Sequence, residues 1–324
     1  IISEIIMSSV DQVISSKGVR KCGFRYIDDF EFCYNTNSDA ENGIAIIQEA
    51  LSEFELALNS RKTKIYDTPY VIEPRWIHEI RHINIRSNPI GQRNDIIWLM
   101  DTAFLLAKDY QGDSVIKFAL KKLLDISKID MSNWTLLEDI ITQCIILEPG
   151  TLSDCLNILI KLENAGHILD KLSLEYCLNN TIIRHGPLGH GSELAWSIWG
   201  CLALDIPLSY EACNAAVTVN DSIVSLLMLD ARQKGLTNKS LNLTSWQAKM
   251  TTKDLYEEHW LLAYEANVQG WLNNINSIDH VAVDPLFGFL KSVGVKFYNP
   301  VIRPVIPPHT ISQPSSNMLA SGIY

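Results

Sequence analysis

The sequence predicts an α+β layer over about the first 93 residues, followed by a mainly α-helical domain. In the first part, a helix-spaced segment is followed by two short runs rich in aromatic and β-branched residues, a second helix-spaced segment and an extended stretch. From about residue 95, helix-spaced segments follow one another, and the joints between them contain Gly, Pro, Asn and Asp. This order favours a helix packed on a small antiparallel sheet, then a helical array.

The start of the chain predicts a helix and a hairpin. Apolar residues at helical spacing predict a helix over residues 1–16. Residues 19–27 and 30–34 are typical of two strands, and the adjacent Asp28 and Asp29 between them are typical of a tight turn. We therefore expect a β-hairpin with two aspartates at its tip.

The next segments complete the layer. Residues 35–42 are rich in Asn, Asp and Glu and are expected to form a loop, whereas residues 45–58 have helical spacing. Residues 59–72 are expected to return to extended chain as a further strand.

The remaining chain predicts a series of helices that recur in pairs about every 35 to 45 residues, the scale of tetratricopeptide and HEAT-type repeats. A nonrepetitive helical domain is the alternative. The expected helices span residues 96–108, 113–124, 134–147, 151–165, 173–183, 193–204, 210–217, 221–234, 252–269 and 283–293. We place the domains at residues 1–93 and 94–295, with an irregular Pro- and Ser-rich tail at 296–324.

Composition excludes several classes of protein. The chain has 324 residues, of which 47% are hydrophobic, and lacks an uninterrupted apolar run long enough for a membrane span or a signal peptide. We therefore expect a cytoplasmic protein with no membrane partner. Seven cysteines without a CxxC pair argue against a zinc site and against a disulfide framework, and predict buried reduced thiols.

Charge is unevenly distributed along the chain. The formal net charge is −10, but residues 1–93 hold 11 Lys and Arg against 13 Asp and Glu, which leaves 16 against 24 for the rest. The basic residues of the first part cluster at Lys17, Arg20, Lys21, Arg25, Arg61, Lys62, Lys64, Arg75, Arg81, Arg86 and Arg93. Phosphate binding needs local cations, so a polyanion is expected against the N-terminal third.

The aspartate pair has two interpretations. Turn preference alone explains two aspartates at a hairpin tip. A rigid hairpin would also provide carboxylates for the hard cations used in phosphoryl transfer. The tetrapeptide at residues 26–29, YIDD, resembles the YxDD box of reverse transcriptases.

Two neighbouring segments resemble the same family in the same order. Residues 3–12, SEIIMSSVDQ, are similar to the helix that closes the preceding polymerase motif, with Asp11 at its end. Residues 58–64, LNSRKTK, resemble the LN and KT segment of bacterial reverse transcriptases. The resemblance covers about residues 1–75 and implies part of a polymerase palm.

The resemblance implies specific roles. Asp28 would be a catalytic metal ligand, with Asp29 as an accessory carboxylate at the same Mg²⁺ site, where Mn²⁺ is an alternative. Tyr26 would lie under the primer terminus or the incoming dNTP, and Lys62 would lie near the triphosphate. Arg25, which precedes the box, would also bind substrate.

One departure from the family pattern stands out. The family's other metal-binding aspartate lies in a strand upstream of residue 1, and Asp11 cannot replace it because Asp11 is expected on a helix. We therefore expect that the sequence begins partway through a larger protein.

The helical part narrows the resemblance to the abortive-infection and defence-associated reverse transcriptases of bacteria, whose palms precede HEAT-like repeats. Those relatives imply DNA synthesis in antiphage defence, in several cases protein-primed and untemplated, by oligomers that can carry a non-coding RNA. Candidate priming hydroxyls are Tyr256, Tyr264, Tyr298 and Tyr324, by residue type only. The alternatives are a catalytically inactive scaffold that binds nucleic acid or protein, and a template-copying retron or maturase-type enzyme.

A further segment, residues 184–199, reads RHGPLGHGSELAWSIW. A metal interpretation needs its histidines and Glu193 to converge, and the HExxH spacing is absent. The favoured interpretation is structural, with Ser192 capping a helix and Trp196 and Trp199 buried in the core. Nucleic acid stacked on the tryptophans is the alternative.

Overall fold

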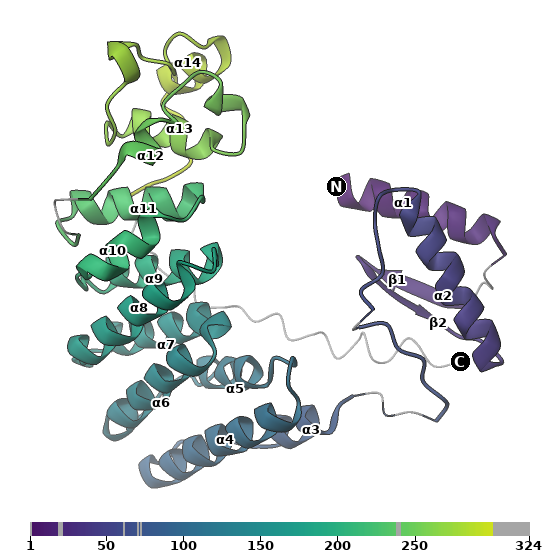
Figure 1. The fold of residues 1–324 in the computed structure, drawn as a ribbon. Coiled ribbons are helices and arrows are strands. Elements are labelled where there is room, and N and C mark those ends of the chain that lie inside the picture. The colour runs from purple at the N-terminus through teal and green to yellow at the C-terminus, as the bar shows by residue number, and fades with distance from the viewer. Residues whose placement is uncertain are drawn as a thin grey trace. The chain divides into compact units, whose positions relative to one another are not determined.

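The computed structural model describes residues 2–18, 22–60, 62–69, 71, 73–237 and 241–300. The chain divides into two compact units, Ile1–Pro74 and Arg75–Tyr324 (Figure 1). The division falls earlier than residue 93, and residue 93 itself lies inside helix α4 (Pro89–Asp109). Residues 301–324 of the expected tail lie outside the described residues.

The first unit has the order helix, hairpin, helix. It consists of α1 (Ile2–Ser16), β1 (Gly23–Tyr26), β2 (Asp29–Phe32) and α2 (Asn37–Ser52). The two strands are antiparallel, with Gly23 opposite Phe32 and Tyr26 opposite Asp29. Among the described residues this two-stranded sheet is the only one, so the structure is mostly helical with one small antiparallel hairpin.

A small apolar core joins the two helices to the hairpin. The buried residues are Met7, Val10 and Ile14 of α1 and Ile47, Ala50 and Leu51 of α2. Phe30 and Phe32 of β2 pack against this core. Because successive side chains of a strand point to opposite faces, Asp29 and Glu31 lie on the other face, where both are exposed.

Helix α2 differs from the expected 45–58 helix at both ends. It begins eight residues earlier because Thr36 caps it: the Thr36 side chain accepts a hydrogen bond from the Asp39 backbone N–H. The Asn and Asp residues that favoured a loop therefore form its first turn. Helix α2 ends at Ser52, since Glu55 adopts φ 59° and Leu56 N–H bonds to Leu51 O at 3.0 Å, as at a Schellman terminus.

The further strand expected within residues 59–72 is absent from the described part of that segment. Pro69 has no backbone N–H to donate to a ladder, and Asp67, two positions before it, is a poor strand residue. The described residues of the segment therefore form no strand, and the expected strand is a wrong prediction over them.

Helices, including short 3₁₀ turns, are the regular secondary structure found among the described residues of the second unit. It contains α3 (Arg75–Arg81), α4 (Pro89–Asp109), α5 (Val115–Leu124), α6 (Trp134–Leu147), α7 (Leu152–Asn164), α8 (Lys171–His185), α9 (Gly191–Ala203), α10 (Tyr210–Val217), α11 (Ser222–Gln233), α12 (Thr244–Gln247), α13 (Trp260–Val268) and α14 (Pro285–Ser292). Short 3₁₀ turns lie at Met131–Asn133, Pro149–Thr151, Asp254–Tyr256 and Ile275–Ser277.

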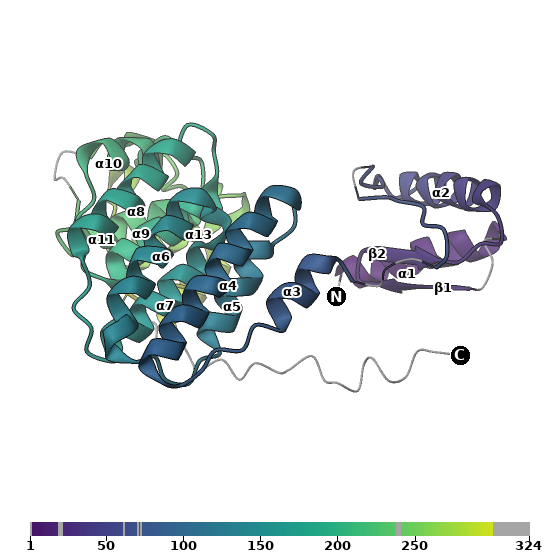
Figure 2. The same ribbon diagram turned by 90° about the horizontal axis from the view of Figure 1, so that it is seen from below.

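Most of these helices stack in two rows. In one row α5 contacts α7, α7 contacts α9, α9 contacts α11 and α11 contacts α13. In the other row α6 contacts α8 and α8 contacts α10. Each helix pair thus packs on the next, the neighbour-to-neighbour arrangement that repeat proteins use to build one continuous core (Figures 1 and 2).

Several features of the second unit differ from expectation, among them the start of α4 at Pro89, seven residues before the expected position 96. Helices α3 and α12 were not expected, and the expected 252–269 helix is divided into a 3₁₀ turn and α13. The division lies at Glu257, whose backbone is extended with ψ −170°. The side-chain hydroxyl of the preceding Tyr256 donates to Asp284, which ties this turn to the start of α14.

Cysteine burial follows expectation only in the second unit. Five cysteines on its helices are buried, whereas Cys22 and Cys33 beside the hairpin are exposed. None of the described helices has both the length and the apolar character needed to cross a bilayer.

Candidate functional site

The tip of the hairpin is a two-residue turn made by Ile27 and Asp28. Asp29 was expected in the turn, but it is the first residue of β2 and pairs with Tyr26. Ile27 adopts φ 58°, a left-handed conformation that is unfavourable for a β-branched side chain. The strained residue directly precedes Asp28, and both Asp28 and Asp29 are exposed.

An aromatic and acidic surface lies on the outer face of the hairpin, which we define by Phe24, Tyr26, Asp29 and Glu31. Tyr26 is 69% exposed and Phe24 is 62% exposed, which is unusual for large aromatic side chains in a strand. The register pairs Tyr26 with Asp29 and Phe24 with Glu31, so each aromatic residue lies beside a carboxylate. All four side chains are exposed in the described part of the chain.

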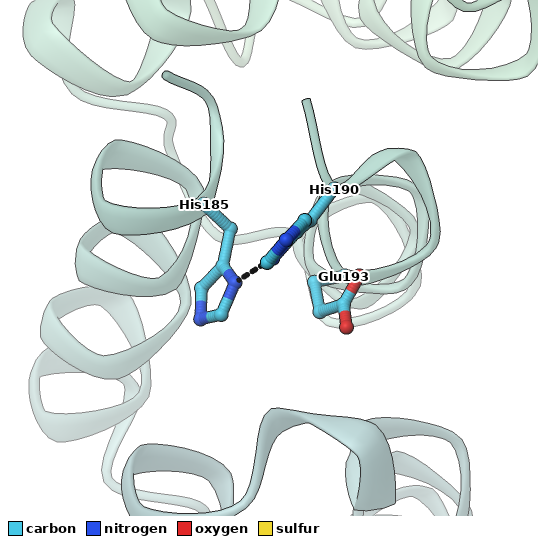
Figure 3. A group of neighbouring side chains, drawn as sticks. All are labelled: His185, His190 and Glu193. Carbon is cyan, nitrogen blue, oxygen red and sulfur yellow. Dashed lines mark hydrogen bonds between the residues drawn. The ribbon is translucent and has the colours of Figure 1, made fainter. Parts of the chain in front are cut away.

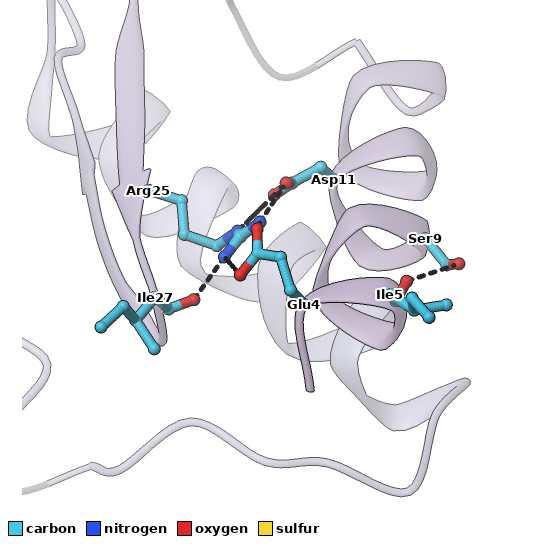
Figure 4. A network of polar contacts seen from close by, with 6 residues as sticks. All are labelled: Glu4, Ile5, Ser9, Asp11, Arg25 and Ile27. Atoms are coloured by element: carbon cyan, nitrogen blue, oxygen red, sulfur yellow. Dashed lines mark hydrogen bonds and ion pairs between the residues drawn. The ribbon is translucent and has the colours of Figure 1, made fainter. Parts of the chain in front are cut away.

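Arg25 lies on the opposite face and is held by carboxylates of α1 (Figure 4). Its guanidinium donates to Asp11 at 2.9–3.1 Å and to Glu4 at 2.7 and 3.3 Å. It also donates to the backbone oxygen of Ile27. The hydrogen bonds that Arg25 donates to Glu4, and then those to Asp11, raise the pKa of Arg25, whose side chain is only 10% exposed. The structure therefore places Arg25 between helix and turn, not on the outer face.

Lys62 is exposed in a turn that Asn59 stabilises. The backbone oxygen of Asn59 accepts from Lys62 N–H at 3.0 Å, from Thr63 N–H at 2.9 Å and from the Thr63 hydroxyl at 3.0 Å. The described residues of the LNSRKTK segment thus form a local turn in which Lys62 is exposed. Arg61 lies outside the described residues.

The donor groups of Asp28 and Asp29 fit Mg²⁺ in kind. Hard carboxylate oxygens suit this ion, which polymerases hold with one or two carboxylates, substrate phosphates and water. The described residues bring no third His, Cys, Asp or Glu to these two, since the three-residue group found among them lies elsewhere. The hairpin therefore brings two carboxylates, Asp28 and Asp29, to its exposed tip.

The candidate priming tyrosines differ in exposure. Tyr264 is fully buried and donates to Val295 O at 2.8 Å. Tyr298 donates to Asp230 at 2.6 Å, and burial together with that carboxylate raises its pKa. Tyr256 is 63% exposed, with its hydroxyl bonded to Asp284 at 2.9 and 3.0 Å. Tyr324 lies outside the described residues.

The structure of residues 184–199 differs in two ways from what the sequence predicted, namely a helix capped by Ser192 and two buried tryptophans. Ser192 does not cap α9, because the helix begins at Gly191 and the N-cap residue is His190, which makes no side-chain capping bond. Trp196 is 38% exposed and meets Trp199 edge to face, at 5.4 Å between ring centroids. The structure brings His185, His190 and Glu193 together without the HExxH spacing that the metal interpretation of this segment lacked.

Comparison of the chain with protein-family models, with curated proteins and with solved structures finds no match.

Proposed function

We propose that the hairpin of the first unit is part of a nucleotidyl-transfer site of the reverse-transcriptase type, which makes DNA from dNTPs in bacterial antiphage defence. The observation that carries the proposal is the strained Ile27–Asp28 turn, which presents Asp28 at an exposed tip beside the paired Tyr26 and Asp29. A β-branched residue at positive φ is retained where the surrounding structure enforces it, and such positions concentrate at functional sites.

Each residue of the site has a role in this proposal. Asp28 is the metal ligand and Asp29 the second carboxylate. Mg²⁺, when bound, supplies charge neutralisation at the phosphates and activation of the attacking hydroxyl. Tyr26 and Phe24 offer an aromatic surface on which a base or sugar can pack. Lys62 offers a mobile point charge to the triphosphate.

Arg25 supports the proposal as a positioning residue. Its carboxylate partners on α1 and its bond to Ile27 O hold the turn against the helix. This arrangement leaves its guanidinium committed to protein groups, so substrate contacts are assigned to Tyr26 and Lys62.

The helical unit has a separate role in this proposal. Stacked helix pairs form extended surfaces that bind partners. We assign to it the binding of nucleic acid, such as a non-coding RNA, or of a second copy of the protein, and Tyr256 is the exposed priming candidate among the described residues.

The test uses the longest native polypeptide that contains these residues. It is incubated with Mg²⁺ or Mn²⁺ and labelled dNTPs, and the polymer is resolved on a denaturing gel. A metal ligand contributes several kcal/mol of transition-state stabilisation. Asp28→Asn should therefore lower the rate of DNA synthesis about 100-fold or more. Asp67→Asn, at an exposed carboxylate outside the hairpin, is the matched control and should retain full activity. Equal product from wild type and Asp28→Asn would end the proposal.

A second candidate function is a noncatalytic scaffold. It is favoured by the absence of a third potential ligand beside Asp28 and Asp29 among the described residues. A scaffold predicts no polymer under any metal, with nucleic-acid binding unchanged in Asp28→Asn. Sequencing any product separates a template copy, as a retron or maturase-type enzyme makes, from untemplated DNA.

A further inference from the structure

Three potential metal ligands meet where α8 ends and α9 begins. His185 is the last residue of α8, His190 is the N-cap of α9 and Glu193 lies in its first turn. Each offers a ligand atom within 4.8 Å of the other two. Figure 3 shows the two imidazole rings side by side, tilted by 38° relative to one another, with Glu193 beside His190. The two Nδ1 atoms are 2.9 Å apart.

The backbone between the helices produces this convergence. His190 N–H and Leu188 N–H both bond to His185 O, at 3.2 Å each, which closes the connection into a tight turn. Gly189 adopts φ 68°, which favours glycine. A Cβ at Gly186 would lie 2.9 Å from the Cβ of Ala215, so close packing against α10 also fixes the turn. The ligand positions are therefore set by packed backbone.

Two imidazoles and one carboxylate form a donor set of intermediate softness. Such sets bind Zn²⁺ and neighbouring divalent transition ions in preference to Mg²⁺, which prefers oxygen ligands. We propose that His185 Nδ1, His190 Nδ1 and the Glu193 carboxylate form a three-ligand Zn²⁺ site. Two nitrogens on one tetrahedral Zn²⁺ lie about 3.3 Å apart, so a small outward rotation of the rings accommodates the ion.

The surroundings set the strength and the openness of this site. His185 Nε2 is buried, and no described residue forms a hydrogen bond with it. Among the described residues, His185 therefore has no outer acceptor of the kind that orients a zinc-bound imidazole and raises affinity. His190 is exposed, which leaves a coordination position open to water. We expect a dissociation constant in the micromolar range and one Zn²⁺ per chain.

Binding is measured by isothermal titration of the metal-free chain with ZnCl₂, after removal of competing thiols. Cys22 and Cys33 are exposed and would bind Zn²⁺ themselves, so the parent for all measurements is the Cys22→Ser/Cys33→Ser double variant. Co²⁺ replaces Zn²⁺ in a parallel experiment, because its visible spectrum reports the ligand geometry. Circular dichroism checks that every variant is folded.

The variants distinguish Zn²⁺ binding at this site from Zn²⁺ binding at other histidines. His190→Ala and the isosteric Glu193→Gln should each weaken Zn²⁺ binding about 10-fold or more and alter the Co²⁺ spectrum. His82→Ala, at an exposed histidine outside the cluster, should bind as the parent does. Millimolar Mg²⁺ should not displace the Zn²⁺. The proposal is overturned if the parent shows no saturable binding, or if His190→Ala and Glu193→Gln bind as tightly as the parent.

Discussion

Arg25 of β1 donates three hydrogen bonds to the carboxylate of Asp11 in α1, at N–O distances of 3.1, 3.0 and 2.9 Å. The same guanidinium donates to Ile27 O, so one side chain joins the first helix to the turn that carries Asp28. Charge-assisted bonds to a planar guanidinium constrain orientation as well as distance. The geometry of the tip therefore depends on a residue on the opposite face of the hairpin.

We predict that Arg25→Met loosens the hairpin before any substrate is added. Loss of these bonds at a partly exposed site should lower the stability of the first unit by about 1 kcal/mol. Faster amide hydrogen exchange in residues 23–32 measures this effect without interference from the second unit. Lys64→Met, at an exposed lysine, is the control. Unchanged exchange in Arg25→Met would show that the network contributes nothing to the hairpin.

A second prediction concerns the strained turn. Ile27→Gly should remove the penalty of a left-handed β-branched residue, and the gain should exceed the entropy lost by glycine, for a net stabilisation of up to about 1 kcal/mol. Urea denaturation monitored in the first unit measures it. Phe24→Gly, at an exposed strand position, has no such strain to relieve and should destabilise. Equal destabilisation by both substitutions contradicts the assignment of strain to Ile27.

The helix residue Gly43 provides a third prediction. A Cβ there would lie 2.0 Å from the hydroxyl oxygen of Tyr34, whose ring is packed against α2. Alanine is ordinarily the better helix residue by about 1 kcal/mol. The overlap should reverse that sign and make Gly43→Ala destabilising by about 1–3 kcal/mol.

A double-mutant cycle tests the cause. In a Tyr34→Ala background the overlap is gone, so Gly43→Ala should become neutral or stabilising. Thermal denaturation of the four proteins gives the coupling. A Gly43→Ala penalty that persists without the tyrosine ring would assign the effect to something other than this contact.

The ion pair between Arg86 and Asp95 predicts that the second unit loses stability at acid pH. The Arg86 guanidinium donates to Asp95 at 2.7 and 2.8 Å and, with the Arg86 backbone N–H, holds the pKa of Asp95 below its ordinary value near 3.8. A carboxyl whose folded pKa is lowered stabilises the fold above its unfolded pKa, and this contribution is lost as the pH falls through the folded value.

Denaturation should therefore show stability falling below about pH 4. Asp95→Asn lacks the titrating group, so it should be less stable at neutral pH and should lose less of its stability on acidification. Asp101→Asn, on the same helix but exposed, is the control and should keep the wild-type slope. If Asp95→Asn lost as much stability on acidification as the wild type, the Arg86–Asp95 pair would be excluded as the cause of that loss.

The last prediction concerns the two exposed thiols. Cys33 N–H bonds to Cys22 O at 2.8 Å, directly beyond the paired residues Gly23 and Phe32, and the nearby Cys22 thiol raises the pKa of Cys33. Mild oxidation should join the two as an intramolecular disulfide, faster at higher pH because the thiolate attacks. Closure of this short loop should raise hairpin stability by about 2 kcal/mol.

Thiol counting by mass spectrometry, with and without reductant, measures this reaction. The buried Cys144 and Cys201 should remain reduced, and Cys22→Ser should abolish the loss of two thiols. Intermolecular dimers as the sole product would show that the two sulfurs do not reach one another.

Local patterns were sufficient for most of the helices. Helical spacing predicted 134–147 and 210–217 with the bounds of α6 and α10, because hydrophobic periodicity reports the buried face of a helix directly. The start of α2 was missed because Thr36, Asn and Asp residues suit a loop and a helix start equally. The strand expected near Pro69 is not formed by the described residues there. An extended sequence pattern is not enough for a strand, because a strand also needs a partner strand to pair with.

Local patterns of residues were enough to predict the helix, hairpin, helix order, the turn with two adjacent aspartates and the long helical part, because these features depend on residues close together in the chain. The face that each residue occupies depends instead on how the elements pack in three dimensions. The turn is made by residues 27 and 28, one position earlier than the expected turn at Asp28 and Asp29. Asp29 is therefore the first residue of β2 and pairs with Tyr26, and because strand side chains alternate between faces, this shift sets the face on which each side chain lies. Packing of α8, α9 and α10 likewise brought His185 to His190 and Glu193, a convergence that depends on close contacts between helices.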